Sequence, residues 1–327
     1  MPSLTVSTGV VRAAFTTVAT LAAVATGWKP LLAQTSEPQK AVLVTGASSG
    51  IGRAITERLA SKGHFVYAGA RTAEDLRALD AIPNVQGVRL DVTKPAEIDA
   101  AVETVRRGGR GLHGVVNNAG VAILAPLIET DESDLAFQLD VNVFGPFRIV
   151  KAFAPLVIES RGRITTIGSI NGIVAGPFSG PYAMSKHAME GFADALAAEM
   201  AGLGVKVSIV EPGRYRSSMS ANVMQRWREK NRSTVGSRFE AQYRRLLTSF
   251  GPENESRYPE PVEVAEAVEH ALFDPAPKLR YLVAPTAAQT HAAVRRAIER
   301  AVELNERQQF ALDRAALIAM LDAAIAR

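Results

Sequence analysis

Residues 41–52 read Ala-Val-Leu-Val-Thr-Gly-Ala-Ser-Ser-Gly-Ile-Gly. The apolar run at 41–45 predicts a short buried strand, and apolar residues recur at helical spacing after residue 50. Between them, Gly46, Gly50 and Gly52 permit a tight turn and close approach to the backbone, while a helix N-terminus offers amide donors to a phosphate. Strand, glycine turn and helix in this order predict a dinucleotide site, although the spacing Gly-x-x-x-Gly-x-Gly differs from the usual Gly-x-Gly-x-x-Gly.

Further short apolar, β-branched runs alternate with longer helical stretches, at 65–68, 85–90, 115–116, 164–167, 205–210 and 279–283. This alternation predicts the α/β class, with a single doubly wound Rossmann-type parallel sheet and helices on both faces. Right-handed crossovers place all the carboxyl ends of the strands at one edge, where ligands bind. Five residues follow predicted strands and are expected to meet there: Gly46, Asp91, Asn117, Ser169 and Pro212.

Tyr182 and Lys186 stand four residues apart, which on a helix places them on one face, one turn apart. A free tyrosine has a pKa of roughly 10 and is a poor base at neutral pH. A fixed cation nearby favours the phenolate, so we expect Lys186 to draw the pKa of Tyr182 toward working pH. The pair would then exchange a proton with an alcohol or carbonyl oxygen.

The ordered motifs resemble those of the short-chain dehydrogenase/reductase family, in its compact subgroup. The matching residues are Thr45-Gly46-x-x-x-Gly50-x-Gly52, Asn117-Asn118-Ala119-Gly120, Asn142, Ser169, Tyr182-x-x-x-Lys186 and Pro212-Gly213. The resemblance spans about residues 40–281, and residues 259–283 are similar to hydroxysteroid and retinol dehydrogenase-like members. It implies one doubly wound domain that binds NAD(P)(H) and transfers a hydride to or from a substrate carbon.

The resemblance also implies residue roles. Ser169 would hydrogen-bond the substrate oxygen, and Asn142 would hold a water that links Lys186 to solvent, which makes Asn142, Ser169, Tyr182 and Lys186 the catalytic set. The implied cofactor-binding residues are Thr45, Gly46, Ser48, Ser49, Gly50, Ile51, Gly52, Arg71, Asp91, Val92, Asn118, Ala119, Gly120, Tyr182, Lys186, Pro212 and Gly213.

Several of these residues have a plain structural interpretation as well. Without the resemblance, Ser169 would be a helix cap or turn serine, and Asn142 a satisfied core amide. Asp91, which the resemblance places against adenine, is equally a candidate N-cap for the next helix. After Pro212-Gly213, a threonine common in the family is replaced by Ser217 or Ser218.

The choice of cofactor follows from charge at the end of the second strand. A ribose 2′-hydroxyl is best received by a carboxylate there, whereas a 2′-phosphate needs a cation. Ala70 stands where NAD-preferring relatives carry aspartate, and Arg71 follows with a planar fork that suits a phosphate. Arg53 is a further candidate cation. We therefore expect NADP(H) rather than NAD(H); the alternative is an arginine that ends a strand in solvent.

The composition agrees with a cytoplasmic enzyme acting on a small molecule. The 327 residues are 47% hydrophobic, enough for one large domain with a sizeable core. There is no cysteine, and the five histidines lack zinc-site spacing, so we expect no metal. The net charge of +4 gives no indication of a nucleic-acid partner. A homo-oligomer is expected.

Residues 214–258 carry ten basic and four acidic residues, interleaved with large apolar ones. They lie where this family places its variable substrate-binding lid, and we expect two helices separated near 231–236. The segment would face an apolar or anionic substrate or a membrane surface; the alternative is a lid helix with a solvated basic face.

Three parts are expected: an extension at 1–39, the nucleotide-binding domain at 40–285 and a helical extension at 286–327. Residues 13–27 are apolar and uncharged, too short to span a bilayer but similar to a signal-peptide core. A disordered extension, a weak membrane anchor and a misassigned start codon are the alternatives. Residues 286–327 show amphipathic helical spacing, expected to pack on the domain or a second subunit.

Two functional classes follow. The first is an NADP(H)-dependent oxidoreductase that acts on a carbonyl or alcohol of a bulky, apolar, steroid-, retinoid- or lipid-like molecule. The alternative is a catalytically idle NADP(H)-binding regulatory protein of the same fold. An intact set of Ser169, Tyr182, Lys186 and Asn142 favours the enzyme, because a protein that only binds has no need of a proton relay.

Overall fold

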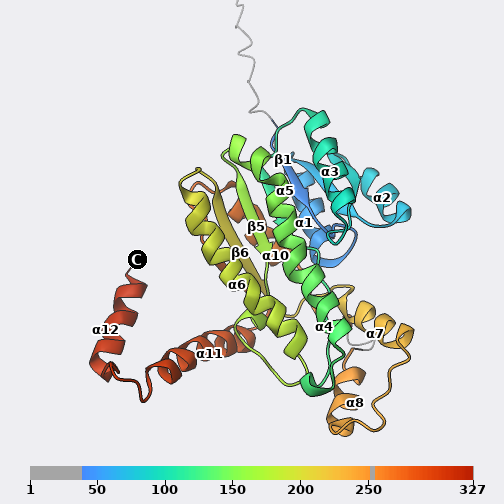
Figure 1. Cartoon of the computed structure of the whole chain (residues 1–327). Coiled ribbons are helices and arrows are strands. Elements are labelled where there is room, and N and C mark those ends of the chain that lie inside the picture. Colours follow the sequence, from blue (N-terminus) through green and yellow to red (C-terminus); the bar gives the residue numbers. More distant parts are fainter. Residues whose placement is uncertain (1–38, 251–254, 327) are drawn as a thin grey trace, which may run out of the picture. The chain divides into compact units, whose positions relative to one another are not determined.

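The computed structural model describes residues 39–250 and 255–326 (Figure 1), so the expectations for residues 1–38 concern a segment outside the described part. Seven parallel strands form one sheet. They are β1 (Ala41–Val44), β2 (Phe65–Ala70), β3 (Val85–Arg89), β4 (Gly114–Asn117), β5 (Arg163–Ile167), β6 (Lys206–Pro212) and β7 (Arg280–Val283). Each predicted strand is present within two residues at either end; Asn117 and Pro212, expected just after strands, are the last residues of β4 and β6.

The strand order is β3-β2-β1-β4-β5-β6-β7. The chain moves outward in one direction from β1 to β3 and then returns to the other side of β1 at β4. This reversal makes β1 and β4 the switch point, where the loops that follow the two strands part and leave a crevice. The glycine turn follows β1, so it borders that crevice.

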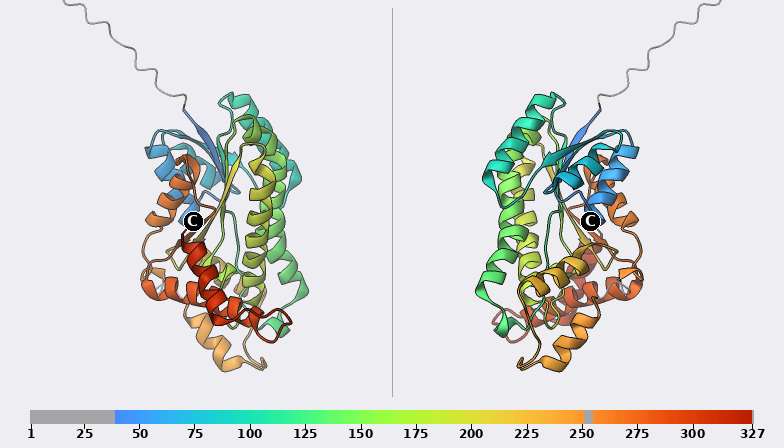
Figure 2. Two further views of the ribbon diagram at one scale, coloured as in Figure 1. Left: turned by 90° about the vertical axis from the view of Figure 1, so that its left-hand side faces the viewer. Right: turned by 90° about the vertical axis from the view of Figure 1, so that its right-hand side faces the viewer.

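Helices cover both faces of the sheet, which confirms the doubly wound arrangement (Figure 2). α1 (Gly50–Ser61) packs against α10 (Val262–Phe273) on one face, and α3 (Pro95–Gly108) against α5 (Gly145–Glu159) on the other. Strand β1 shows why both faces are needed: Ala41 and Leu43 enter one apolar cluster, and Val42 and Val44 enter the other. A strand buried on both sides reads as a continuous apolar run.

The other described helices are α2 (Ala73–Asp80), α4 (Glu132–Leu139), α6 (Gly180–Ala201), α7 (Met219–Glu229), α8 (Glu240–Thr248), α11 (Ala287–Asn305) and α12 (Arg314–Ile325), with the short turns η1 (Leu127–Glu129), η2 (Asp140–Phe144) and η3 (Ile170–Gly172). η2 is a π-helical turn that joins α4 to α5. The joined stretch Glu132–Glu159 is, among the described residues, the one helix with the length and apolar composition to cross a membrane. Ile149, Phe153 and Val157 on it are fully buried against the sheet, as in a core helix.

The segment expected to form the lid contains two helices, α7 and α8, joined by residues 230–239, as predicted. Figure 1 draws both beyond the carboxyl ends of the strands, beside α4. The helices expected after residue 286 are α11 and α12. α11 is tied to α6 by a hydrogen bond of 2.8 Å between Arg300 Nη2 and His187 Nε2, whereas α12 has no buried residue in the described part.

Candidate active site

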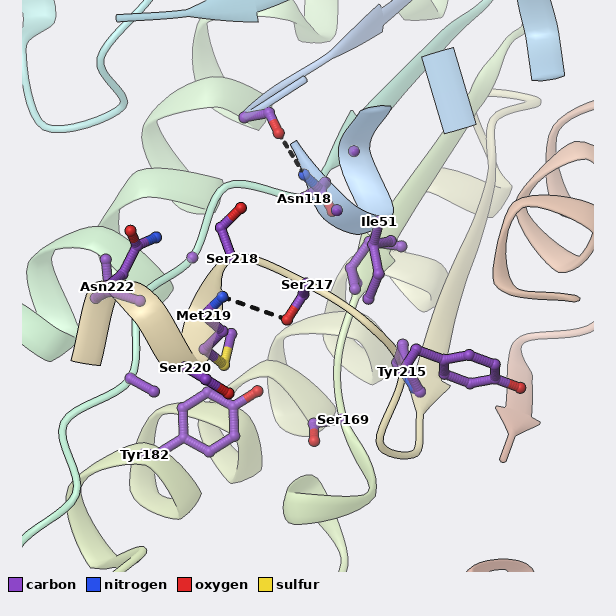
Figure 3. A pocket seen from close by; sticks show the side chains of 18 of the residues that line it. Ile51, Asn118, Ser169, Tyr182, Tyr215, Ser217, Ser218, Met219, Ser220 and Asn222 are labelled. Atoms are coloured by element: carbon purple, nitrogen blue, oxygen red, sulfur yellow. Dashed lines mark hydrogen bonds between the residues drawn. The ribbon is translucent and has the colours of Figure 1, made fainter. Parts of the chain in front are cut away.

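A cavity of about 630 Å³ opens at the carboxyl ends of the strands (Figure 3). Its walls bring together residues from segments more than 200 positions apart in the chain. The predicted site residues that line it are Gly46, Ser48, Ser49, Gly50, Ile51, Gly52, Arg71, Asp91, Val92, Asn118, Ala119, Gly120, Ser169, Tyr182, Lys186, Pro212 and Gly213. Thr45 and Asn142, also predicted, are not part of the cavity wall.

The glycine turn leaves bare backbone toward this cavity. Gly46 and Gly50 have φ of +63° and +53°, in the left-handed region that favours glycine. At Gly52 a Cβ atom would lie 2.2 Å from the Gly46 carbonyl oxygen, so the helix can approach the turn only with glycine there. The first turn of α1 carries no acidic residue, and its N-cap Ser49 makes no capping bond, which leaves amide donors for an anion.

Thr45 supports this turn from behind. Its Oγ1 accepts hydrogen bonds from the amides of Asn118 and Ala119, both at 3.0 Å. Asn118 Nδ2 returns the contact by donating to the carbonyls of Thr45 (2.9 Å) and Gly46 (3.0 Å). The loops after β1 and β4 are therefore fixed to each other. Asn117 joins the next strand, with Nδ2 3.4 Å from Thr166 Oγ1.

Arg71 and Asp91 stand at the end of the cavity formed by β2 and β3. Arg71 is exposed and makes no hydrogen bond or ion pair with another residue of the described part. Asp91 is not a helix N-cap, because Lys94 caps α3. Its Oδ1 accepts from the amide (3.0 Å) and the hydroxyl (2.7 Å) of Thr93. Burial works to raise the pKa of Asp91, but the two bonds from Thr93 and the charges of Arg71 and Lys94 outweigh it and lower the pKa.

Arg53 does not share this position. Its Nε lies 2.5 Å from Glu57 Oε1, one turn along the surface of α1, and it does not line the cavity. The expectation that Arg53 helps to bind a phosphate is therefore not supported by its place in the fold, because its cationic head already has a carboxylate partner. Of the two arginines expected to bind a phosphate, Arg71 is the one that lines the cavity.

Tyr182, Lys186 and Ser169 meet on the cavity floor (Figure 3 shows Tyr182 and Ser169). The two α6 residues lie one turn apart, with Lys186 Nζ 5.7 Å from the centre of the Tyr182 ring. Lys186 is 6% exposed, and its Nζ donates to the carbonyl of Ile167 at 2.8 Å, at the end of β5. Ser169 caps η3, where its Oγ accepts from the amide of Asn171 at 3.1 Å.

The pKa of Tyr182 shifts in the direction opposite to the one expected from the sequence. Burial raises the pKa of Tyr182, and a hydrogen bond with Ser169 only partly opposes this. Burial lowers the pKa of Lys186 to about 8, while the charge of Glu190 acts in the other direction. The expected lowering of the Tyr182 pKa by Lys186 is wrong in direction for this structure, because loss of solvation dominates at both side chains.

Asn142 lies in η2, and its side chain is satisfied by neighbours. Its Oδ1 accepts from the amide of Val121 at 2.8 Å, and its Nδ2 donates to the carbonyl of Val121 at 2.9 Å and to Ser185 Oγ at 3.1 Å. It therefore fixes the loop after β4 to the helix that carries the tyrosine. π-helical turns are frequent at functional sites. The plain interpretation of a satisfied core amide describes the contacts of this side chain.

Some cavity residues were not identified from the sequence. Gln289 of α11 lines the cavity, and its Oε1 accepts from the amide of Arg214 at 2.8 Å and fills the space beside Gly213. The C-terminal extension thus braces the turn that follows β6. Ser217 and Ser218, which the sequence did indicate, also line the cavity, and Ser217 Oγ accepts from the amide of Met219 at 3.3 Å. A glutamine in an otherwise ordinary helix gives no sequence signal for this role.

The lid forms the remaining wall. Met219 and Ser220, at the beginning of α7, lie on the same side of the cavity as the Tyr182 ring (Figure 3). Ser220, Phe250 and Glu255 also line a second hollow of about 700 Å³ between α7 and α8. Its other walls include the apolar Met224, Trp227 and Leu247 and the cationic Arg228, Arg232 and Arg244.

Charged contacts join the lid to α4. Asp134, 1% exposed, lies 2.8 Å from Arg226 Nη2 and 3.3 Å from Lys230 Nζ and also pairs with Arg232. The exposed Asp131 contacts the same Arg232 at 2.7 Å. A buried carboxylate surrounded by three cations holds the far end of α7 against the body of the domain.

Comparison with known proteins agrees with this geometry. The sequence profile of the short chain dehydrogenase family matches residues 40–228. An uncharacterized oxidoreductase, YbbO, of Escherichia coli K12 is 33% identical over 249 residues, covering 75% of this chain and 86% of that protein. The human 17-beta-hydroxysteroid dehydrogenase type 6 is 36% identical over 255 residues, covering 74% of this chain and 80% of that protein.

Solved structures give the same result. A short chain dehydrogenase/reductase from Burkholderia phymatum in complex with NAD is 26% identical, with a TM-score of 0.68, covering 84% of this chain and 98% of that chain. A short chain dehydrogenase from Burkholderia cenocepacia in complex with NADP is 27% identical, with a TM-score of 0.62, covering 81% and 95%. Both bind a nicotinamide dinucleotide. This chain belongs to the short-chain dehydrogenase/reductase family of oxidoreductases, and its relatives include hydroxysteroid and retinol dehydrogenases.

Proposed function

We propose that this protein is an NADP(H)-dependent oxidoreductase that interconverts a carbonyl and an alcohol on a bulky apolar molecule. The observation that carries the proposal is the meeting of Ser169, Tyr182 and Lys186 on the floor of the same cavity that the glycine turn borders. An acid/base group beside a dinucleotide cradle is what carbonyl reduction requires.

The residues have distinct tasks at the substrate oxygen. The Tyr182 hydroxyl gives its proton to that oxygen during reduction and takes it back during oxidation. Its raised pKa keeps Tyr182 protonated at neutral pH, which suits the donor role. Ser169 donates a hydrogen bond to the same oxygen, and charged Lys186 stabilises the phenolate once the proton has left. When bound, a nicotinamide dinucleotide supplies or accepts the hydride at the substrate carbon.

The residues present fit this cofactor. The bare backbone of Gly46 to Gly52 and the uncapped amides of α1 suit a pyrophosphate, and Pro212 and Gly213 line the same cavity. Arg71 supports NADP(H) over NAD(H), because it lines the cavity with its guanidinium unpaired among the described residues and the preceding residue is Ala70. Ser218 is a candidate hydroxyl for the carboxamide, since Ser217 is used inside its own turn.

The substrate class follows from the walls. Leu124, Met219, Leu246 and Phe250 line the main cavity, and the second hollow continues past Phe250 toward Trp227. A rigid or elongated apolar molecule would fill both spaces, with its reacting oxygen at Tyr182. The relationship to a hydroxysteroid dehydrogenase supports the same class. A small-molecule partner and a homo-oligomer complete the proposal, with a cytoplasmic location or membrane association through residues 1–39 as the two alternatives.

A turnover assay tests it. Purified protein would be given NADPH and a panel of ketones and aldehydes that runs from small aliphatic to steroid- and retinoid-sized, and NADPH consumption would be followed. We expect turnover that rises with apolar size and is slower with NADH. NADPH binding without turnover on any member of the panel would favour the idle regulatory protein instead.

A further inference from the structure

Two neighbouring carboxyl groups, each with a buried Oε1 atom, lie close to Lys186. Glu190 is on α6, one turn after Lys186, and Glu211 is on β6, directly before Pro212. Glu211 is 1% exposed, and in the described part of the chain neither its buried Oε1 nor the buried Oε1 of Glu190 accepts a hydrogen bond from an N–H group. Burial raises the pKa of Glu211, and the charge of Glu190 and a hydrogen bond with it add to this rise. One proton held between the two carboxyl groups would satisfy both buried oxygens and leave one negative charge on the pair.

The charges around this pair come from three elements. From β7, Arg280 Nε lies 3.1 Å from Glu190 Oε2 and 3.7 Å from Glu211 Oε1. Its Nη2 lies 2.7 Å from Asp194 of α6, which is exposed. Lys186 is the other cation that faces Glu190. The cluster thus contains Lys186, Glu190, Asp194, Glu211 and Arg280, of which Lys186 and Glu211 are buried.

The pair also lies under the turn that carries Ser169. At Gly172, the last residue of η3, a Cβ atom would be 2.7 Å from Glu190 Oε1 and 3.2 Å from the carbonyl oxygen of Lys186. Glycine lets the turn rest directly on the carboxyl group. Glu190 therefore packs against the turn that begins after Ser169, and it lies on the same helix as Lys186. Its neighbour Glu211 lies on β6, directly before Pro212.

We infer that Glu190 is a positioning residue that keeps the buried Lys186 ammonium charged, and that Glu211 holds Glu190 in place by sharing its proton. The inference rests on the proposed function, in which charged Lys186 stabilises the Tyr182 phenolate. A buried ammonium with one carbonyl acceptor needs a nearby counter-charge to stay protonated. Glu190 is the carboxylate that opposes the effect of burial on Lys186.

Two variants separate charge from packing. In Glu211→Gln an amide N–H replaces the shared proton, so Glu190 keeps its charge and its hydrogen bond. In the double variant Glu190→Gln, Glu211→Gln the volume stays the same and the negative charge is gone. Glu190→Gln alone is unsuitable, because Glu211 would ionise in its place.

Two quantities are measured: the pH at which activity falls, and the pH at which Lys186 loses its proton. Ketone reduction would be followed against pH, and the Lys186 ammonium titrated by NMR, assigned with Lys186→Met. We expect the basic limb and the NMR midpoint of the double variant to fall by about one pH unit relative to Glu211→Gln. At a pH above the limb, this corresponds to turnover about 10-fold lower. Equal midpoints in the two variants would overturn the inference.

Arg280→Met should shift the titration midpoint of Lys186 in the opposite direction. It provides the test if the double variant does not fold. Removing this exposed cation makes the cluster more negative, so the midpoint of Lys186 should rise; a fall or no change would count against the inference. The NMR titration does not need substrate. A wild-type protein that reduces no ketone would therefore end the proposed function, while the titration still decides the role of Glu190.

Discussion

The cavity floor and the lid are held in place by different forces. In and directly beneath the floor, Thr45, Asn118, Asn142 and Lys186 each bond to main-chain atoms of the sheet or of the loops that leave it. The lid is attached through charged side chains, chiefly the three cations around Asp134. The arginines and the lysine of that group are 17% to 37% exposed at their side chains.

This difference separates chemistry from substrate choice. Hydrogen bonds to the backbone of a buried sheet leave no room for the reacting groups to shift, and salt does not screen them. Partly exposed ion pairs are weakened by salt and yield when a ligand pushes against them. We therefore expect changes on the floor to affect turnover, and changes in the lid to affect which substrates are accepted.

The largest expected effect is on the floor. Tyr182→Phe keeps the ring and its packing and removes the acid/base hydroxyl. Turnover should fall by at least about 10²-fold, with NADPH affinity largely unchanged. Single-turnover kinetics together with fluorescence titration of NADPH would measure both. Near wild-type turnover in the variant would show that the proton comes from another group.

Arg71 is fixed neither by the backbone nor by an ion pair in the described chain, so it tests the rim of the site. Removing a bidentate phosphate contact should cost about 1.5–3 kcal/mol. Arg71→Ala should therefore weaken NADPH binding by roughly 10- to 150-fold and leave NADH binding almost unchanged. Isothermal titration with both cofactors measures this, with Arg53→Ala as the matched control. Equal losses for the two cofactors would make Arg71 a structural residue.

Most of the floor could be predicted from the sequence because its groups are local in sequence. Gly46, Gly50 and Gly52 lie within one turn, and Tyr182 and Lys186 within one helical turn, so spacing alone brings them together. Parallel strands then gather such groups at one edge. The strand pattern was sufficient for the fold, with small differences at the ends: Pro212 completes β6 instead of following it.

What the sequence did not predict depends on contacts between distant segments. Gln289 reaches Arg214 across 75 residues, and Asp134 meets Arg226 across 92. The pKa of Tyr182 was given the wrong direction because burial, unlike helical spacing, is a property of the whole fold. Thr45 fits the motif, but its hydroxyl faces the loop after β4.

The lid attachment gives the third prediction. Asp134→Asn removes the buried charge that three cations share. Breaking a fully buried pair costs about 3–5 kcal/mol, but these cations stay partly hydrated, so we expect about 1–2 kcal/mol in urea unfolding. KM for a bulky ketone should rise and kcat for a small aldehyde should not change. Asp131→Asn is the matched control, since its pair is exposed and should cost less than about 1 kcal/mol. Equal effects of the two substitutions would mean that burial of Asp134 does not matter to the lid.

The smallest expected effect concerns the apolar face of the lid. Trp227 lines the second hollow, with its ring 5.2 Å from that of Tyr243. Phe239 packs on Phe178 with ring centres 5.7 Å apart and does not line the hollow. Trp227→Ala should weaken bulky ketones by about 1 kcal/mol relative to small aldehydes. Phe239→Ala, an aromatic deletion of similar kind, should shift this ranking less.

Hydrogen exchange on the same variants sharpens the comparison between lid and floor. Because a lid becomes ordered when it covers its ligand, exchange in α7 and α8 should slow on adding NADPH and a bulky ketone, by more than in β5 and β6. Trp227→Ala should reduce this protection, since the ketone then has less apolar surface to contact. Protection that ignores the ligand, together with an unchanged substrate ranking in both variants, would make α7 and α8 a static wall. The preference for large apolar substrates would then have to come from the residues beside Tyr182.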